Sequence, residues 1–223
     1  MLRFASIGFA ALCLASASPA LGETRGSARV VEPGGAPKNT DSLPQMQHEI
    51  RDTANAIVTL ETDFGKMVLE LYRDVAPAHA DSFLARVNDG FYSGTKFHRI
   101  ISDFMIQGGN PFEAGKKSVG YYLPNELNNL PHKFGALSMA SRGVPTTAQT
   151  QFFICMDRNY KTKALDGRYV VFGQVLKGFD VLWKIGHVAV KASGPMRGEM
   201  SQPVEEVWLR KAFRSDAEGT PLK

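Results

Sequence analysis

The feature that most constrains the fold of this chain is a succession of short β-type segments separated by turns rich in glycine and proline. The first two, Ala56–Thr62 and Lys66–Tyr72, flank Thr62-Asp-Phe-Gly65, a sequence typical of a tight hairpin. Further segments of this kind are Lys96–Ile101, Phe104–Gln107, Gly135–Ala140, Gln151–Met156, Tyr169–Val175 and Val204–Phe213.

Two segments show helical periodicity instead. One begins at Pro77 and ends at Gly90, and the other runs from Gly178 to about Gly186. Many short strands with one early and one late helix predict a mainly β fold, a closed antiparallel barrel with a helix over each end. We expect the long segments between the strands to be functional or mobile loops. They are Asn110–Asn129, Ser141–Thr150 and Val190–Pro203.

The N-terminal residues have the composition of a targeting segment. Arg3 precedes the short apolar stretch Phe4–Ala15, and small residues then continue to Gly22. This order predicts a signal peptide over residues 1–22, cleaved after Ala20 or Gly22. The alternative, an uncleaved membrane anchor, is disfavoured because the apolar stretch is short. We therefore expect export, with the periplasm as the destination, and no membrane span after cleavage.

Composition divides the rest of the chain. Residues 23–53 are rich in Gly, Pro, Ser and Thr and predict a flexible linker or tail. Residues 54–214 predict a globular domain, and residues 215–223 predict a C-terminal tail.

The net charge of +4 comes with no long Lys/Arg run, which favours solubility and not nucleic-acid binding. Beyond the signal peptide only Cys155 remains, so no intrachain disulfide can form and we expect a monomer held by its core alone.

Several common chemistries have no support in the sequence. There is neither a phosphate-binding loop nor a Gly-x-Ser-x-Gly nucleophile motif, and the five histidines lack metal-ligand spacing. Cys155 lies within Phe152-Phe-Ile-Cys-Met156, which favours a buried strand thiol over a nucleophile. We therefore expect no metal and no cofactor.

Two segments look unlike ordinary core. Phe97–Pro111 places an arginine and an amide among aromatic and apolar residues. A strand there would put Met105 and Gln107 on one face, and a second strand would do the same for Gln151 and Phe153. Large apolar side chains that share a face with Arg and Gln predict a lined pocket with polar orienting groups.

These segments resemble the cyclophilin family. Phe97-His-Arg-Ile-Ile-x-x-Phe-Met-Ile-Gln-Gly-Gly-Asn110 is similar to its central signature. Gly135-Ala-Leu-Ser-Met-Ala140, Gln151-Phe-Phe-Ile-Cys155 and Leu165-Asp-Gly-Arg-Tyr-Val-Val-Phe-Gly173 follow in the family's order, and the resemblance extends from Ala56 to Phe213. It implies a closed eight-stranded antiparallel barrel capped by two α-helices. It also implies peptidyl-prolyl cis-trans isomerase activity on proline-containing polypeptides.

The resemblance also implies residue roles. Arg99 corresponds to the catalytic arginine, and Gln107 orients it and the substrate backbone. Ala140 and Gln151 edge the peptide groove, and Tyr169 takes the position of a histidine at the pocket rim. The residues implied to line the proline pocket are Phe104, Met105, Phe153 and Leu165.

The chain departs from the family pattern at three places, one of which is the loop from Leu137 to Gln151, about one residue longer than in the best-known members. Ala164 takes the position of a tryptophan at the pocket edge, so we expect weak cyclosporin binding. Ala140-Ser-Arg142 replaces an Ala-Asn sequence, so the groove wall loses an amide and gains a charge. His98, next to Arg99, is interpreted as a structural histidine.

Three functional hypotheses remain from the sequence. The first is a folding enzyme that isomerises X-Pro bonds in exported proteins. The second is a proline-peptide-binding chaperone or assembly module with incidental isomerase activity. The third is a structural envelope protein that docks through residues 23–53, although a linker explains that segment more simply.

Overall fold

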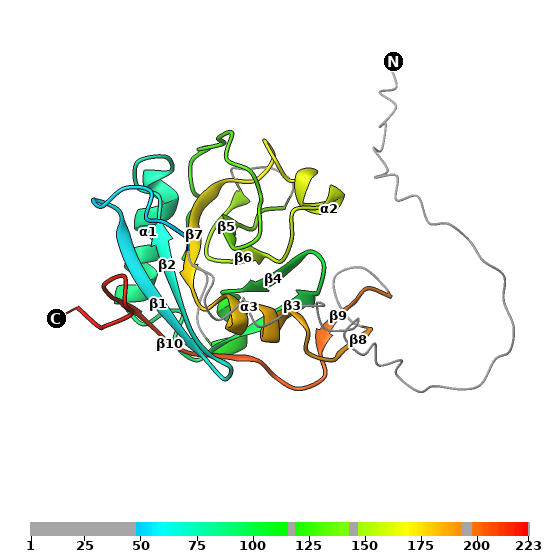
Figure 1. Cartoon of the computed structure of the whole chain (residues 1–223). Helices are drawn as coiled ribbons and strands as arrows, with labels where there is room; N and C mark the ends of the chain where they lie inside the picture. The colour runs from blue at the N-terminus through cyan, green and yellow to red at the C-terminus, as the bar shows by residue number, and fades with distance from the viewer. Residues whose placement is uncertain (1–47, 116–118, 143–146, 193–197, 223) are drawn as a thin grey trace, which may run out of the picture.

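The structure, a computed structural model, describes residues 48–115, 119–142, 147–192 and 198–222. Within these residues, eight strands close into a barrel in the order β1-β10-β3-β4-β6-β5-β7-β2, and all neighbours are antiparallel. The closed antiparallel barrel predicted from the sequence is therefore confirmed (Figure 1).

The strands of the barrel lie close to the positions predicted for them. They are β1 (Ala56–Thr62), β2 (Gly65–Leu71), β3 (Thr95–Ile101), β4 (Met105–Gly108), β5 (Ala136–Met139), β6 (Phe152–Cys155), β7 (Val171–Lys177) and β10 (Trp208–Arg214). The helices are α1 (Pro77–Asn88), the 3-10 turn η2 (Pro111–Ala114), the short α2 (Tyr160–Lys163) and α3 (Phe179–Gly186). The short helix α2 and the turn η2 were not predicted, because each spans a single turn and shows no periodicity.

The prediction of a loop over Val190–Pro203 was wrong at its two ends. β8 (Val190–Ala192) and β9 (Met200–Pro203) pair antiparallel as a separate sheet, with Val190 opposite Pro203. Strands this short carry too few residues for an alternating pattern to appear in the sequence. The two strands lie beside the barrel, where β9 packs against β3 (Figure 1).

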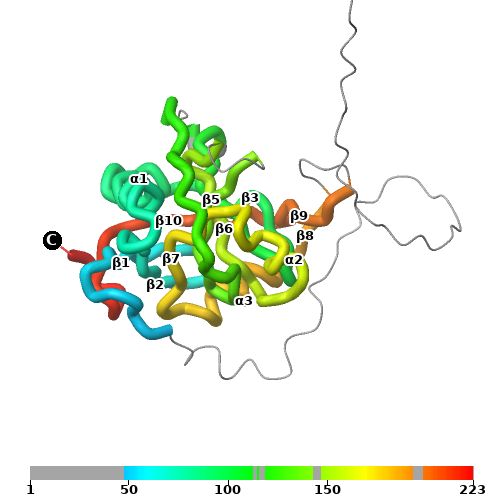
Figure 2. The backbone as a smooth tube through the Cα atoms, turned by 90° about the horizontal axis from the view of Figure 1, so that it is seen from above, coloured from blue at the N-terminus to red at the C-terminus, as the bar shows by residue number. Residues whose placement is uncertain are grey.

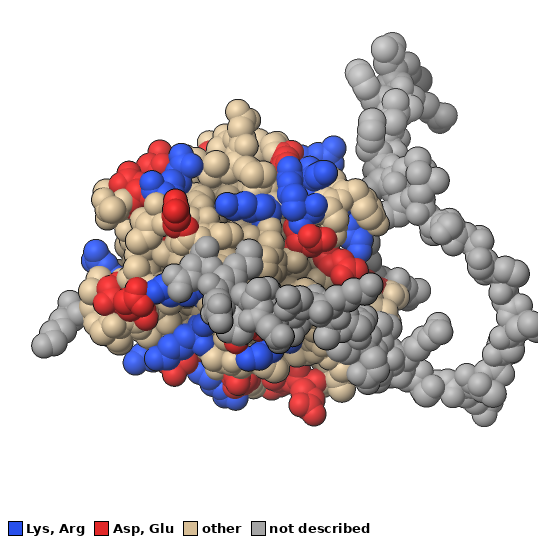
Figure 3. Space-filling view, in the orientation of Figure 1, with Lys and Arg blue, Asp and Glu red and all other residues tan. Residues whose placement is uncertain are grey.

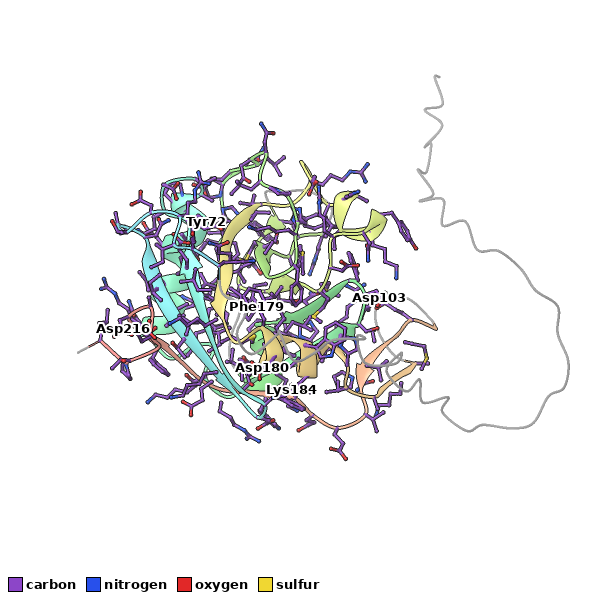
Figure 4. All side chains as sticks on the ribbon, viewed as in Figure 1. Tyr72, Asp103, Phe179, Asp180, Lys184 and Asp216 are labelled. Atoms are coloured by element: carbon purple, nitrogen blue, oxygen red, sulfur yellow. The ribbon has the colours of Figure 1, made fainter. Side chains whose placement is uncertain are left out.

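The two longer helices contribute to the same interior core from different sides. α1 begins with a proline and buries Phe83 and Val87 against β1, β7 and β10. α3 packs against β2, β3 and β4 with Phe179 fully buried, while Asp180 and Lys184 pair at 2.9 Å on its outer side (Figure 4). Figure 2 shows both helices against the barrel in a second view.

One row of apolar side chains in the barrel interior crosses four paired strands. Ile100 of β3 lies opposite Ile106 of β4, which lies opposite Ile154 of β6 and then Leu137 of β5. All four side chains are completely buried and belong to the main hydrophobic core. Residues one step away along these strands therefore point to the outer face of the barrel.

Both ends of the described chain are tied to the barrel. The buried carboxylate of Glu70 accepts hydrogen bonds from the backbone of Arg51 and Asp52 and from the side chains of Asn55 and Gln174. At the other end, Ser215 Oγ lies 2.8 Å from the hydroxyl of Thr59. The signal peptide predicted over residues 1–22 lies outside the described residues.

The described surface carries charges of both signs. Figure 3 shows Lys and Arg side chains interspersed with Asp and Glu on one face of the molecule. Among the described residues, no helix is both long enough and apolar enough to cross a membrane.

Candidate active site

A β-bulge in β3 sets the direction of Arg99. Phe97 pairs with Gly108 and Arg99 with Gln107, so two steps along β3 oppose a single step along β4. Phe97 points into the main core, and without the bulge Arg99 would point the same way. The extra residue, His98, allows Arg99 to lie on the outer face.

Arg99, Gln107 and Phe153 form one row on that outer face. Gln107 lies opposite Arg99 on one side and opposite Phe153 on the other. Arg99 Nη1 donates to Gln107 Oε1 at 3.4 Å, and Gln107 Nε2 donates to Gln151 Oε1 at 2.9 Å. The structure thus brings together the arginine and both glutamines that the sequence predicted.

A second hydrophobic cluster, which we call the outer cluster, lies beside this row and apart from the main core. Its buried members include Met105 and Phe153, and the predicted pocket residues that pack against them are Phe104, Ala140, Leu165 and Tyr169. Arg99 Nη1 lies 3.9 Å from the sulfur of Met105. The predicted site residues are therefore gathered at one place on the barrel wall.

Phe153 is held between two aromatic rings. His132 stacks on it with ring centroids 5.8 Å apart and an interplanar angle of 13°. Tyr169 meets it edge-on at 5.8 Å and 84°. Tyr169 therefore packs against a predicted pocket residue.

The ring of His132 belongs to a Ser–His–Asp arrangement that the sequence gave no reason to expect. His132 Nε2 lies 3.1 Å from Ser138 Oγ, and His132 Nδ1 lies 2.9 Å from Asp166 Oδ1. Ser138 and His132 are completely buried, and Ser138 Oγ donates to the carbonyl of Val170 at 2.8 Å. A substrate cannot reach this serine, so the arrangement fixes the ring that supports Phe153 and does not form a hydrolase triad.

Asp166 also accepts a hydrogen bond from Arg158 at 2.6 Å and one from the backbone of His132 at 2.9 Å. Burial raises the pKa of Asp166, but the hydrogen bonds from Arg158 and His132 outweigh it and lower the pKa to about 2. Since Asp166 directly follows Leu165, this network fixes one wall of the outer cluster.

Glu199 is the site residue that the sequence did not reveal. Its two carboxylate oxygens accept from Arg99 Nε at 2.7 Å and from Arg99 Nη2 at 2.8 Å. It lies just before β9, one hundred residues from Arg99 in the chain. No local pattern could have indicated this contact, because only the packing of β9 on β3 brings the two residues together.

Two neighbouring titratable groups, His98 and Cys155, are neutral at pH 7. Burial, together with the charge of Arg99, lowers the pKa of His98 to about 4, in agreement with the structural role predicted for it. Burial also raises the pKa of the Cys155 thiol well above its usual range, and Cys155 is fully buried in β6, as predicted. Among the described residues, no three His, Cys, Asp or Glu side chains gather as a metal site.

The remaining predicted positions lie around the outer cluster. The backbone of Ala140 donates to the carbonyl of Gln151 at 2.8 Å, so both residues continue the pairing of β5 with β6. Ala164 ends α2 and is exposed beside Leu165. Arg142 is exposed at the start of the predicted loop, part of which, residues 143–146, lies outside the described residues.

An open pocket of about 550 Å³ borders the outer cluster. It is formed by residues 48–51 where they pass β7, and Tyr72, Leu130 and Lys133 contribute to its wall. Its wall shares Tyr72, Leu130, Ala136 and Val171 with the outer cluster, although none of the residues that the sequence predicted for the site lines it.

Comparison with known proteins agrees with this geometry. The family described as "Cyclophilin type peptidyl-prolyl cis-trans isomerase/CLD" matches residues 57–212. A peptidyl-prolyl cis-trans isomerase of Acinetobacter baylyi is 41% identical over 157 residues, which cover 68% of this chain and 83% of that protein. The human peptidyl-prolyl cis-trans isomerase-like 1 is 38% identical over 164 residues, covering 71% of this chain and 92% of the relative.

Solved structures show the same similarity. A cyclophilin type peptidyl-prolyl cis-trans isomerase from Cryptosporidium parvum superposes with a TM-score of 0.62 at 30% identity, covering 73% of this chain and 98% of that one. A second structure of that protein, in the presence of the dipeptide Ala-Pro, gives a TM-score of 0.61 at 30% identity, covering 72% of this chain and 99% of that one. The chain belongs to the cyclophilin family, and it is a peptidyl-prolyl cis-trans isomerase.

The network around Asp166 makes a prediction for acid stability. Because the folded-state pKa of about 2 lies below the ordinary value of 3.8, its contribution is present at neutral pH and is lost as the pH falls from about 4 to about 2. Since Asp166 is one-third exposed, we expect Asp166→Asn to destabilise the fold by about 1 kcal/mol at pH 7 and by less at pH 2. Chemical denaturation at both pH values measures the difference.

The exposed carboxylate of Asp81, which pairs with Arg73 on the surface, provides the control variant Asp81→Asn. We expect this control to change the free energy of unfolding by less than Asp166→Asn does at pH 7. An equal loss of stability at pH 7 and pH 2 for Asp166→Asn would show that ionisation of Asp166 does not contribute.

Proposed function

We propose that this enzyme isomerises X-Pro bonds with Arg99 as the catalytic residue and the outer cluster as the proline pocket. The observation that carries the proposal is the position of the Arg99 guanidinium at the edge of the outer cluster, 3.9 Å from Met105 and 3.4 Å from Gln107. A proline ring seated among Met105, Phe153 and Leu165 would place its nitrogen near these donors.

The chemistry follows from the electronic structure of the amide. Rotation about an X-Pro bond crosses a barrier of about 18–20 kcal/mol, which the double-bond character of the C–N bond creates. In the twisted transition state the prolyl nitrogen becomes pyramidal and regains a lone pair. A guanidinium N–H directed at that lone pair binds the twisted form better than either planar isomer, and this differential binding lowers the barrier.

One prediction from this mechanism concerns Arg99. Arg99→Ala should lower kcat/KM for a short X-Pro peptide by about 10²-fold, the usual effect of removing one transition-state donor. Arg210→Ala, which removes an exposed arginine paired with Asp63 on the barrel surface, is the matched control and should leave activity unchanged. Peptide isomerisation and thermal melting are measured together, and full activity in folded Arg99→Ala would refute the assignment.

The binding-module hypothesis makes a different prediction for the same variant. A chaperone with incidental activity would keep its effect on the refolding of a proline-containing protein after Arg99→Ala. The hydrogen bonds that link Arg99 to Gln107 and Gln107 to Gln151 support the enzyme, because an apolar binding surface needs no arginine held at its edge. We expect the acceleration of refolding to be lost together with peptide turnover.

We also propose that the enzyme acts on exported proteins as a monomer in the periplasm. The support is the composition of residues 1–22, a positive residue followed by a short apolar stretch and small residues. The mature chain should begin between Leu21 and Glu23. N-terminal sequencing of protein fractionated from its native host tests this, and a cytoplasmic chain that retains Met1 contradicts it.

A further prediction concerns cyclosporin. Ala164 is exposed at the end of α2, so a larger side chain there can extend toward the outer cluster without displacing the core. We expect weak cyclosporin binding by the parent protein and a gain of about 1–3 kcal/mol on Ala164→Trp, the effect of burying one large side chain. Calorimetric titration of both forms with cyclosporin measures the two affinities. Tight binding by the parent protein would contradict the assignment of Ala164 to the tryptophan position.

A further inference from the structure

The strongest contacts of Arg99 are with Glu199 and not with its neighbours in the row. Both hydrogen bonds to the Glu199 carboxylate are below 3 Å, at 2.7 and 2.8 Å, whereas the bond to Gln107 is 3.4 Å long. A bidentate pair between guanidinium and carboxylate is shorter, stronger and more directional than a bond to a neutral amide. Glu199 therefore dominates the orientation of the guanidinium.

Glu199 occupies only one edge of the guanidinium. The carboxylate takes the side edge, formed by Nε and Nη2, and leaves the end edge, formed by Nη1 and the outer hydrogen of Nη2. Nη1 lies next to Met105 and Gln107, on the side of the outer cluster. The ion pair thus fixes the plane and direction of the guanidinium without taking the donor that faces the pocket.

The carboxylate is itself held in place. The Ser201 hydroxyl hydrogen-bonds to Glu199, and Ser201 is buried in β9 with only 1% of its surface exposed. The side chains of Arg99 and Glu199 are 19% and 18% exposed, so this is not a loose surface ion pair. Hydrogen bonding from Arg99 also lowers the pKa of Glu199, which keeps the carboxylate ionised at neutral pH.

We propose that Glu199 is a positioning residue for catalysis, which fixes the guanidinium of Arg99 with its end edge toward the proline pocket. This inference rests on the proposed catalytic role of Arg99. A long, flexible arginine loses rotamer freedom when it contacts a transition state, and a partner that fixes it beforehand removes that cost from the reaction. The β8–β9 sheet thereby supplies part of the active site.

The test is Glu199→Gln in the full-length protein. The variant keeps the shape of the side chain but replaces one accepting oxygen with a donor, so the bidentate pair is lost. We expect kcat to fall about tenfold, because the donor is less often in the productive orientation, with KM changed by less than about twofold. Magnetisation-exchange measurements on a proline peptide give kcat and KM separately.

The matched control is Glu206→Gln. Glu206 pairs with Lys96, which lies on the same strand as Arg99, but this pair does not touch the outer cluster. The control breaks an ion pair to β3 and should leave both kcat and KM unchanged. An equal fall in kcat for Glu206→Gln would assign the effect to general loosening of β3 and would overturn the proposal.

A double-mutant cycle separates this inference from the proposed function. In an Arg99→Ala background, Glu199→Gln should change the residual kcat by less than about twofold, because its effect acts through Arg99. Full activity in Arg99→Ala refutes the catalytic role of Arg99 itself. Loss of activity in Arg99→Ala together with unchanged or increased kcat in Glu199→Gln refutes the positioning role alone.

If Glu199→Gln does not fold, Ser201→Ala carries the test instead. It removes the hydroxyl that holds the carboxylate but leaves the ion pair, so we expect a smaller fall in kcat, by about threefold, with KM unchanged. An unchanged kcat in folded Ser201→Ala would then overturn the proposal.

Discussion

The active site depends on the single extra residue in β3. A regular strand alternates its side chains between the two faces, so Phe97 and Arg99 would point the same way. The bulge between them lets Phe97 fill the barrel interior while Arg99 points outward, opposite Gln107. Without this change of register, either a core aromatic residue would be exposed or an arginine would enter an apolar interior, at a large cost in solvation energy.

This arrangement separates stability from catalysis. The interior row through Ile100, Ile106 and Ile154 stabilises the barrel, whereas the outer cluster around Phe153 is the proline pocket that we propose. Phe153 belongs to the same strand as Ile154, so the rigidity of the barrel is passed directly to the pocket. The buried hydrogen bonds among Ser138, His132 and Asp166 extend that support to the loop residue Leu165.

The features that could be predicted from the sequence are those that leave a local pattern in it. Alternation located the eight barrel strands to within a few residues, and the spacing of Met105 and Gln107 correctly placed them on one face. It could not predict β8 and β9, which are too short for periodicity, nor the contact of Glu199 with Arg99, which joins segments one hundred residues apart. The Ser–His–Asp arrangement was missed for a similar reason, since Asp166 lies 34 residues along the chain from His132. The roles of the site residues came from resemblance, and they remain predictions.

The charge balance at the site indicates how the arginine works. Glu199 offsets the charge of Arg99, and His98 is neutral at pH 7, so the immediate surroundings of the guanidinium carry little net charge. A balanced pair produces a weak field at a distance, and so it attracts charged substrates poorly. At hydrogen-bond distance the remaining N–H of Arg99 still acts as a directed donor. In the mechanism that we propose, recognition then falls to the apolar pocket, which accepts a proline ring whatever the charges of the neighbouring residues. In the same proposed mechanism, Arg99 acts on the prolyl nitrogen, whose lone pair appears only during rotation.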